Sequence, residues 1–301
     1  MAHIDELLSK YQDKRKEVKE LIESNYKGKI YNPLNSGSYA KSTAINCKFD
    51  LDVVVPFKRS SFNTLEELFD DVYELLYEKY YDVATVRKQK VSIGIEFYSD
   101  EDGDVINLDI VPGRELNEDK YIEDKKLNLY VNSQFGLLAK NTYIQTNIDA
   151  QIQHIKAKQN ERKIIRLLKI WKYRNSEKYK SFLIELITIK AFDKSYINGN
   201  LWEQLKSVME YIENNVNQEN FTLKDPGNSN NNVIETLTEY EREEFSNDMR
   251  RIIKNIEDDE NDIKIYFPMN EEFEEDNSEN RYGVKEGSAS LASVPPDTRF
   301  G

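Results

Sequence analysis

GSYAKSTAINCKFDLDVVVPF, residues 37–57, is the stretch of sequence that decides the fold. Two acids, Asp50 and Asp52, stand at the start of its apolar run, where an ionised carboxylate is costly unless it is paired or bound to a metal. Side chains alternate along a β-strand, so positions 50 and 52 share one face, roughly 6.6 Å apart along the strand. Two neighbouring carboxylates raise each other's pKa unless a cation lies between them, and an all-oxygen site suits Mg²⁺. The stretch therefore predicts a strand that carries a magnesium site.

A Gly-Ser pair, Gly37 and Ser38, opens the same stretch and precedes a short helix that we predict over residues 39–45. Glycine lets the backbone approach a phosphate closely, backbone N–H groups at a helix start bind anions, and Ser38 adds a hydroxyl donor. Gly-Ser pairs are common in turns, so this one gains its meaning from the two acids that follow it. We expect the pair to bind phosphate next to the magnesium site.

A third acid lies inside a later apolar run. Residues 83–98 alternate between apolar and polar side chains and predict one strand, and VINLDIV at residues 105–111 predicts the next strand. A hairpin return would place Asp109, the single acid of this second run, next to the earlier strand. We therefore expect Asp109 to join Asp50 and Asp52.

The segment DEDGD, residues 100–104, is a rival metal site. Its acids have the alternate spacing of a calcium-binding loop, but the bidentate Glu of that motif at loop position 12 is missing. We therefore predict a solvated turn.

The composition bounds the class of protein. The chain has 301 residues, of which 39% are hydrophobic and 32% charged, enough for a globular protein with one large domain or two lobes. It lacks an apolar run of the roughly 18 residues that a membrane span needs, and its first residues lack a signal-peptide core, so we expect a cytoplasmic protein. Two His and one Cys leave little material for a zinc site or disulfides. The net charge of −13 argues against broad nucleic-acid binding.

Helical periodicity surrounds the strand region. Apolar residues at helical spacing predict amphipathic helices over residues 4–26 and 64–80, and further helices from residue 149 onward. Residues 181–192 are apolar on nearly all sides and predict a central helix. The segment DPGNSNNNV at residues 225–233 predicts a polar loop.

These pieces together resemble a known family. A Gly-Ser pair, a spacer, Asp-hydrophobic-Asp on a strand and a third Asp on a later strand resemble the polymerase-beta-type nucleotidyltransferases. LLKIWKYR and SFLIELITIKAF, residues 167–174 and 181–192, are similar to the helical lobe of oligoadenylate synthases and cyclic GMP-AMP synthases, and DPGNSNNNV resembles their Asp-Pro…Asn-Asn-Val segment. Over about residues 4–265 the chain looks most like the bacterial cGAS/DncV-like nucleotidyltransferases (CD-NTases) of CBASS antiphage systems.

The resemblance implies an α+β fold. A polymerase-beta-like core, a mixed sheet flanked by helices, would pack against a helical lobe and carry a long N-terminal spine helix. The implied domains are a nucleotidyltransferase core with the spine helix at 1–148, a helical lobe at 149–268, and an acidic linker with a disordered tail at 269–301. Low hydrophobicity of the tail also favours disorder.

The resemblance also implies an activity. The chain would be an enzyme that makes a cyclic di- or trinucleotide second messenger from NTPs and releases pyrophosphate, by two-metal in-line transfer. Asp50 and Asp52 would hold two Mg²⁺ ions, for which Mn²⁺ substitutes, and Asp109 would complete one metal site and accept the proton of the acceptor hydroxyl. The alternatives are a nucleotidyltransferase that modifies a small molecule, a protein or a tRNA end, and a non-catalytic nucleotide-binding scaffold.

Further site residues follow from the same resemblance. Gly37 and Ser38 match the family's phosphate-binding pair, and Lys169 matches its triphosphate lysine. Ser181 and Phe182 match a Ser-Tyr pair that binds phosphate and stacks on a base. Phe in place of Tyr keeps the stacking, worth roughly 1–3 kcal/mol, and loses the hydroxyl. The residues alone leave open that Lys169 is an ordinary solvated lysine and that Phe182 is a core residue.

The implied partners are small molecules and proteins. The substrates would be ATP, GTP or pyrimidine NTPs. The acidic balance and the lack of a Cys/His zinc cluster argue against activation by nucleic acid, and bacterial members are constitutive or controlled by a protein partner. The tail ends in Gly301 and resembles tails that a ubiquitin-transfer-like partner joins to a target through the final glycine.

Overall fold

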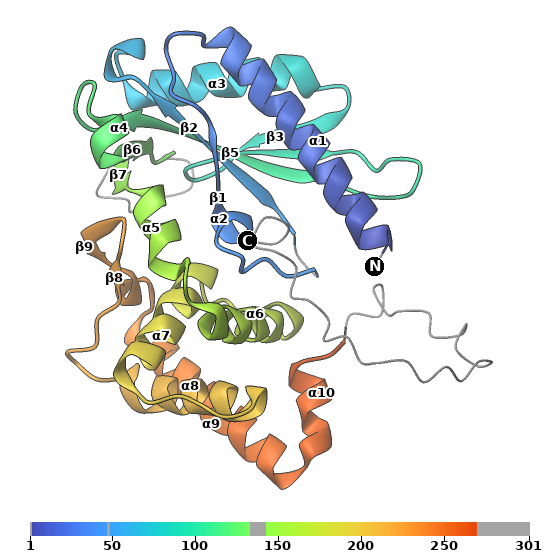
Figure 1. Ribbon diagram of the computed structural model, residues 1–301, viewed down its shortest axis with the longest axis vertical. Coiled ribbons are helices and arrows are strands. Elements are labelled where there is room, and N and C mark those ends of the chain that lie inside the picture. Colours follow the sequence, from blue (N-terminus) through green and yellow to red (C-terminus); the bar gives the residue numbers. More distant parts are fainter. Residues whose placement is uncertain (1, 47–48, 133–142, 270–301) are drawn as a thin grey trace.

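A seven-stranded sheet fills the upper half of the molecule in Figure 1, and a group of helices fills the lower half. The computed structural model describes residues 2–46, 49–132 and 143–269. The strand order is β1-β2-β5-β4-β3, with β6 and β7 extending the sheet from β5. The strands are β1 (Leu34–Ser36), β2 (Leu51–Phe57), β3 (Ala84–Lys88), β4 (Ile93–Phe97), β5 (Asn107–Glu115), β6 (Leu127–Tyr130) and β7 (Tyr143–Thr146). β2 and β5 run parallel and the other pairs antiparallel, which confirms the predicted mixed sheet.

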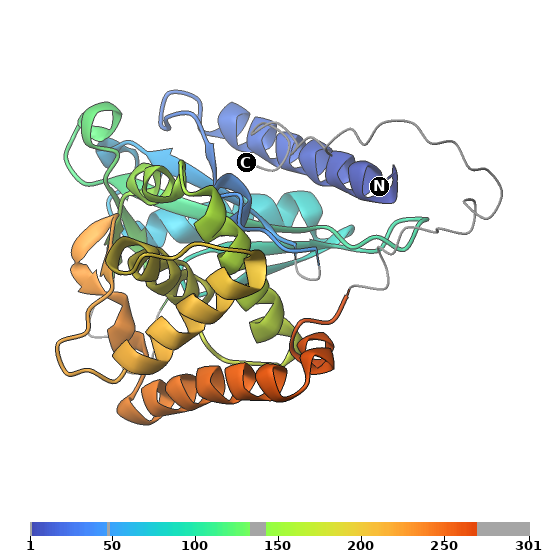
Figure 2. The same ribbon diagram turned by 60° about the horizontal axis from the view of Figure 1, so that its bottom comes forward.

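Two helices cover one face of this sheet. Helix α1 (Ala2–Asn25) is the predicted spine helix, and helix α3 (Leu65–Tyr80) begins after Thr64, whose side chain accepts a hydrogen bond from the Glu67 amide. Both helices pack in one core with Val53, Val55 and Ile110. Because side chains alternate along a strand, Asp52 and Asp109 belong to the opposite face. That face points toward the helical half of the molecule, as Figures 1 and 2 show.

The predicted strand over residues 83–98 is wrong in one respect: it is two strands, β3 and β4. The chain turns back at residues 89–92, where the Gln89 amide donates a hydrogen bond of 2.8 Å to the Ser92 carbonyl. The antiparallel register, Val86 opposite Ile95, places both apolar sets on one face. A strand of the predicted length would far exceed the usual strand of about six residues, so folding back buries more apolar surface within one sheet.

A predicted short helix and a predicted loop also differ from the structure. The short helix predicted over residues 39–45 is a single turn, α2 (Gly37–Ala40). The predicted polar loop 225–233 contains a hairpin of β8 (Lys224–Asp225) and β9 (Asn228–Asn232). Its polar side chains bond the backbone: the Asp225 carboxylate accepts from the Gly227 amide at 2.8 Å.

The lower half of the molecule has a core of its own. It joins buried residues from α6 to α9, and α7 is buried on nearly all sides, which confirms the predicted central helix. The helices of this half are α5 (Ile148–Ile155), α6 (Gln159–Arg174), α7 (Ser181–Lys194), α8 (Leu201–Asn215), α9 (Glu239–Asp258) and α10 (Ile263–Tyr266), while the short α4 (Tyr121–Asp124) lies beside the sheet. Within the described ranges, none of the helices combines the length and apolar character that crossing a membrane requires.

The predicted domain division stays a prediction, although the two separate cores favour it. The boundary at 148/149 falls where the sheet ends, after β7, and α5 begins. From residue 270 onward the predicted tail, with Gly301, lies outside the described residues.

Candidate active site

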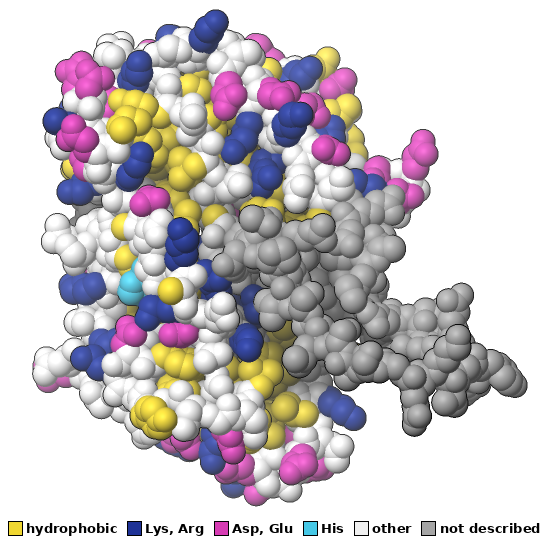
Figure 3. Space-filling model, in the orientation of Figure 1, with side chains coloured by type: hydrophobic (Ala, Val, Ile, Leu, Met, Phe, Trp, Pro, Cys, Tyr) yellow, Lys and Arg dark blue, Asp and Glu magenta, His cyan; other side chains and the backbone are white. Residues whose placement is uncertain are grey.

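Two adjoining cavities lie where the sheet meets the helices. The smaller, of about 190 Å³, is lined by Ser38, Ile45, Asp50, Asp52, Lys169, Lys172, Tyr173 and Ser181. The larger, of about 800 Å³, shares Asp50 and Tyr173 with it and adds, among others, Gln89 and Asp109. Figure 3 shows Lys and Arg side chains gathered across the middle of the molecule, between its two halves. An acidic wall on the sheet side thus faces basic side chains on the helical side.

The acidic wall comes from two neighbouring strands. Asp52 on β2 and Asp109 on β5 are direct partners in the parallel register, and Asp50 comes just before β2. We call Asp50, Asp52 and Asp109 the strand trio. Burial, and then the charges of Asp109 and Asp50, raise the pKa of Asp52 to about 7. The structure therefore brings together the three acids that the sequence singled out, in a place that favours an added cation.

Gly37 touches the central acid of this trio. Its φ is +64°, and a Cβ there would lie 1.6 Å from Asp52 Oδ2. Any side chain would displace the carboxylate, so only glycine fits both the backbone angle and the contact. Ser38 follows it and lines the smaller cavity beside Asp50. The predicted Gly-Ser pair thus lies directly against the acids.

Lys169 lies on the opposite wall, on α6. It is only 8% exposed, and its Nζ donates a hydrogen bond of 2.7 Å to the Thr43 carbonyl. Burial lowers the pKa of Lys169 to about 8, while the carboxylates of Glu185 and Asp52 act in the opposite direction. The alternative of an ordinary solvated lysine is therefore wrong.

Ser181 and Phe182 lie in different surroundings in the structure. Ser181 begins α7 and lines the smaller cavity, where its Oγ lies 3.3 Å from Lys172 Nζ. Phe182 lines neither of the two cavities: it packs against the helical core, with Lys41 Nζ 4.5 Å from its ring centroid. The aromatic side chain that lines both cavities is Tyr173. Stacking of a base on Phe182 stays a prediction.

Three cations hold the segment after α2 to the helical half, and the sequence analysis missed two of them, Lys41 and Arg166. Lys41 forms a buried ion pair of 3.0 Å with Glu185 on α7, and Arg166 donates to the Ser42 carbonyl at 2.7 Å. The third is the bond of Lys169 to Thr43. A sequence signal existed, because positions 166, 169, 172 and 173 fall on one helical face.

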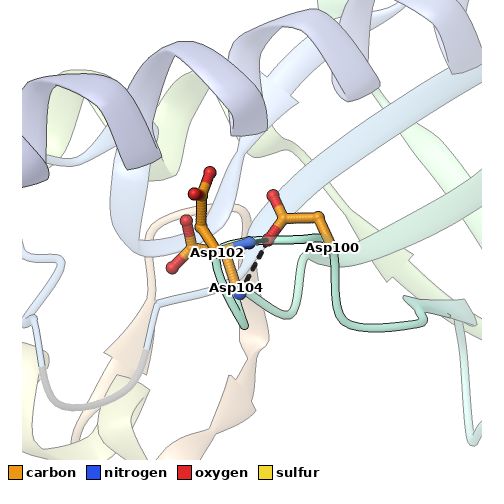
Figure 4. A group of neighbouring side chains, drawn as sticks. All are labelled: Asp100, Asp102 and Asp104. Carbon is orange, nitrogen blue, oxygen red and sulfur yellow. Dashed lines mark hydrogen bonds between the residues drawn. The ribbon is translucent and has the colours of Figure 1, made fainter.

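A second acidic group lies on the turn between β4 and β5. Ligand atoms of Asp100, Asp102 and Asp104, here called the turn trio, all lie within 4.8 Å of one another (Figure 4). Asp100 Oδ1 accepts hydrogen bonds from the amides of Asp102 and Asp104 at 3.0 and 2.9 Å. Lys10 Nζ on α1 lies 2.8, 2.5 and 2.7 Å from the three carboxylates. The prediction of a turn is confirmed, but the acids face an ammonium group as well as water.

The donor chemistry of the strand trio fits a hard divalent cation such as Mg²⁺ or Mn²⁺. All ligands are carboxylate oxygens, and the raised pKa of Asp52 shows a buried charge that lacks full compensation. Among the described residues, ligand atoms of the turn trio lie within 4.8 Å of one another, whereas at least one pair in the strand trio is further apart. The spacing of the ligand atoms thus favours the turn trio, whereas burial of carboxylate charge favours the strand trio. We assign the metal site to the strand trio, because the Lys10 ammonium already occupies the place between the acids of the turn.

Comparison with known proteins adds a family model and curated relatives. Residues 3–134 match the model of a Second Messenger Oligonucleotide or Dinucleotide Synthetase (SMODS) domain. A CBASS oligonucleotide cyclase CdnC of Escherichia coli strain KTE188 is 27% identical over 271 residues, covering 81% of this chain and 80% of the relative. A cyclic AMP-AMP-AMP synthase of E. coli strain MS 115-1 is 26% identical over 203 residues, covering 63% and 59%.

Solved structures share the fold. E. coli MS115-1 CdnC with ATP has a TM-score of 0.64 at 22% identity, covering 87% of each chain. The same CdnC in a complex with HORMA-deltaN has a TM-score of 0.64 at 21% identity, covering 87% and 86%. A Vibrio cholerae DncV cyclic AMP-GMP synthase has a TM-score of 0.57 at 12% identity, covering 78% of this chain and 68% of its own. The predicted nucleotidyltransferase fold is therefore confirmed.

Proposed function

The chain is a cGAS/DncV-like nucleotidyltransferase, and on that premise we propose that it is a cyclic oligonucleotide synthase of a CBASS antiphage system. It joins NTPs into a cyclic di- or trinucleotide and releases pyrophosphate. The observation that carries the proposal is the direct pairing of Asp52 with Asp109 on parallel strands, with Asp52 and Lys169 lining the same cavity.

In this proposal the smaller cavity takes the triphosphate of the donor nucleotide. The Ser38 hydroxyl donates from the sheet side, and the ammonium groups of Lys169 and Lys172 lie on the helical side. Ser181 already lies 3.3 Å from Lys172 Nζ and adds a second hydroxyl. These groups orient the triphosphate so that its α-phosphorus faces the strand trio, which is the positioning that phosphoryl-type transfer mainly requires.

The larger cavity takes the acceptor nucleotide. It is lined by Asp109, the candidate proton acceptor for the attacking ribose hydroxyl, and by Tyr173. Tyr173 is 45% exposed and lines both cavities, so its ring is available to stack on a base at either site, in place of Phe182. A second round of the same reaction on the bound linear product would close the ring.

Asp50, Asp52 and Asp109 are the residues that would hold Mg²⁺ or Mn²⁺. When bound, such ions offset the charge of the triphosphate and lower the pKa of the attacking hydroxyl. Gly37 keeps the Asp52 carboxylate in place, since nothing larger fits against it. Lys41 and Lys169 lower the pKa of Asp52, which favours its ionised, metal-binding form.

Control by a protein partner belongs to the same proposal. The similar CdnC has been solved in a complex with HORMA-deltaN, which supports a regulatory protein for this chain. The acidic net charge of −13 disfavours nucleic acid as the activator.

Product analysis tests the proposal. Purified chain, Mg²⁺ and all four NTPs, one radiolabelled at the α-phosphate, should give small products that resist phosphatase and have the mass of a cyclic di- or trinucleotide. The double variant Asp50→Asn with Asp52→Asn should give none while its melting curve stays cooperative. Label that appears instead on an added tRNA, protein or small molecule would favour the modifying enzyme, and full activity of the double variant would refute the site.

A further inference from the structure

A glutamine outside the acidic set contacts the third acid of the strand trio. Gln89, at the end of β3, donates from Nε2 to Asp109 Oδ1 at 2.9 Å. Ser92, in the turn between β3 and β4, donates from Oγ to Gln89 Oε1 at 2.9 Å. We propose that Gln89 is a positioning residue that fixes the Asp109 carboxylate for metal binding and proton transfer, and that Ser92 fixes Gln89. This inference rests on the proposed function of the strand trio.

The hydrogen-bond chain from Ser92 through Gln89 to Asp109, here called the relay, runs in one direction because of the order of its donors and acceptors. An ionised carboxylate only accepts hydrogen bonds, so the NH₂ group of Gln89 must face Asp109. The amide oxygen then faces Ser92, whose hydroxyl has a hydrogen to donate. The opposite amide orientation would place an amide oxygen against the carboxylate of Asp109, so Asp109 fixes the orientation of the Gln89 amide and the Ser92 hydroxyl donates to its oxygen.

A glycine makes room for the relay. Gly94 on β4 is the register partner of Asp109 across the β4–β5 pair. A Cβ at that position would lie 2.4 Å from Gln89 Nε2 and 3.3 Å from Asp109 Oδ1. The Gln89 amide therefore occupies the space that a side chain at position 94 would fill. The Gln89–Ser92 backbone hydrogen bond of 2.8 Å closes the turn that presents both side chains.

The neutral charge of glutamine matters for this role. Lysine or arginine at position 89 would also hold Asp109, but its positive charge would compete with a divalent cation. An amide restricts the carboxylate and leaves the negative charge in place, as the supporting partners of metal ligands commonly do. Gln89, Asp109 and Asp50 all line the larger cavity, so the relay acts at the edge where the acceptor would lie.

The test combines two variants with a measurement that needs no turnover. Mn²⁺ binding to the chain without nucleotide is followed by electron paramagnetic resonance, and pyrophosphate release is measured with NTPs. Gln89→Leu should weaken Mn²⁺ binding and lower kcat, each by roughly 10–100-fold, because the metal ligand loses its supporting partner. KM for the NTPs should change by no more than about twofold, since the triphosphate contacts remain.

The double variant separates a relay from ordinary packing. Ser92→Ala should cost severalfold in the native background and nothing further in the Gln89→Leu background, because Ser92 acts only through Gln89. Gln153→Leu, the same chemical change at an exposed position on α5, is the matched control and should behave as the native chain.

Two outcomes would overturn the inference. Gln89→Leu with native Mn²⁺ affinity and kcat would do so, as would an equal cost of Ser92→Ala in both backgrounds. Should Gln89→Leu fail to fold, Ser92→Ala alone decides, because it removes one hydroxyl, and native behaviour there counts against the relay. If the native chain binds Mn²⁺ but makes no product, the proposed function is refuted. The Mn²⁺ affinity of the native chain, compared with that of Gln89→Leu, still tests the role of Gln89.

Discussion

The strand trio and the turn trio contain the same residue type in the same number, yet they have different environments. Asp50, Asp52 and Asp109 line cavities between the two halves of the molecule, and burial raises the pKa of Asp52 to about 7. The turn trio is more exposed, with Asp102 at 59% side-chain exposure, and it surrounds the Lys10 ammonium. That pairing lowers the pKa of Asp100 and raises the pKa of Lys10.

The difference teaches that a cluster of acids is not by itself a metal site. Lys10 of α1 supplies a cation to the turn trio, and this ion pairing fastens the β4–β5 turn to that helix. In the strand trio, Lys41 and Lys169 lower the pKa of Asp52 but do not cancel the rise that burial and the neighbouring acids cause. Their ammonium groups are also bonded to other groups, to Glu185 and Thr43. The remaining demand for positive charge is what a divalent cation would meet.

The largest expected effect is on activity. Asp52→Asn should lower the rate of product formation by roughly a thousandfold or more, because it removes a carboxylate that, in the proposed function, binds the divalent cations. Asp102→Asn, the matched change in the turn trio, should stay within about twofold of the native rate. Initial rates of pyrophosphate release measure both. Equal losses in the two variants would erase the distinction between the trios.

The next effect is on the pH dependence of stability. The pKa of Asp52 is about 7 in the folded chain against 3.8 ordinarily, so the folded state holds this proton more tightly, and stability falls as pH rises between these values. The loss is on the order of 4 kcal/mol. Asp52→Asn should therefore raise the free energy of unfolding relative to the native chain, by an amount that increases from pH 5 to about pH 7 and then levels off. Urea unfolding in EDTA measures this.

Asp102→Asn is again the control, and it should lack that trend. The pKa of its neighbour Asp100 is lowered by Lys10, so the contribution of the turn is present above the ordinary pKa and is lost only as pH falls through the lowered value. Between pH 5 and pH 8 the turn trio should change nothing. A rising difference in Asp102→Asn would contradict the opposite signs that we assign to the two trios.

Metal addition should give a smaller shift. Mg²⁺ at about 100 times its dissociation constant stabilises a folded protein by about 2.7 kcal/mol. For a chain of this size each kcal/mol raises the melting temperature by about 2–4 °C. The native chain and Asp102→Asn should both show the shift, and Asp52→Asn should show little of it. Calorimetry with Mg²⁺ against EDTA decides, and a shift that follows the turn trio would transfer the metal site there.

The smallest effect is expected for Lys10→Met. The turn trio then loses its ammonium, while its ligand atoms stay within reach of one cation. We expect a slightly lower melting temperature that rises with added salt, since salt screens the repulsion of the three acids. We also expect one extra, weak Mn²⁺ site by electron paramagnetic resonance. If the native chain already shows that Mn²⁺ site, the Lys10 ammonium does not keep a cation out of the turn trio.

Local sequence patterns predicted much of this arrangement. The apolar run with acids at alternate positions predicted β2 and its two-faced character, and helical spacing predicted α1, α3 and α7. The hairpin within residues 83–98 escaped prediction, because alternation continues on both sides of the turn at residues 89–92 and carries no break. Gln89 was missed for the same reason, since its contacts with Asp109 and Ser92 form only because the chain turns back there.

By itself, then, the sequence determined which acids occupy one face of β2 and β5, because alternation along a strand is a local property of the backbone. Only the tertiary structure decided which acidic group surrounds an ammonium group of the chain and which lines a cavity. Lys10 lies 90 or more residues before the acids of the turn trio in the sequence, and Lys169 acts on Asp52 from helix α6 of the other half. Charge compensation depends on distance in space and on burial, and neither is written in the spacing of residues along the chain.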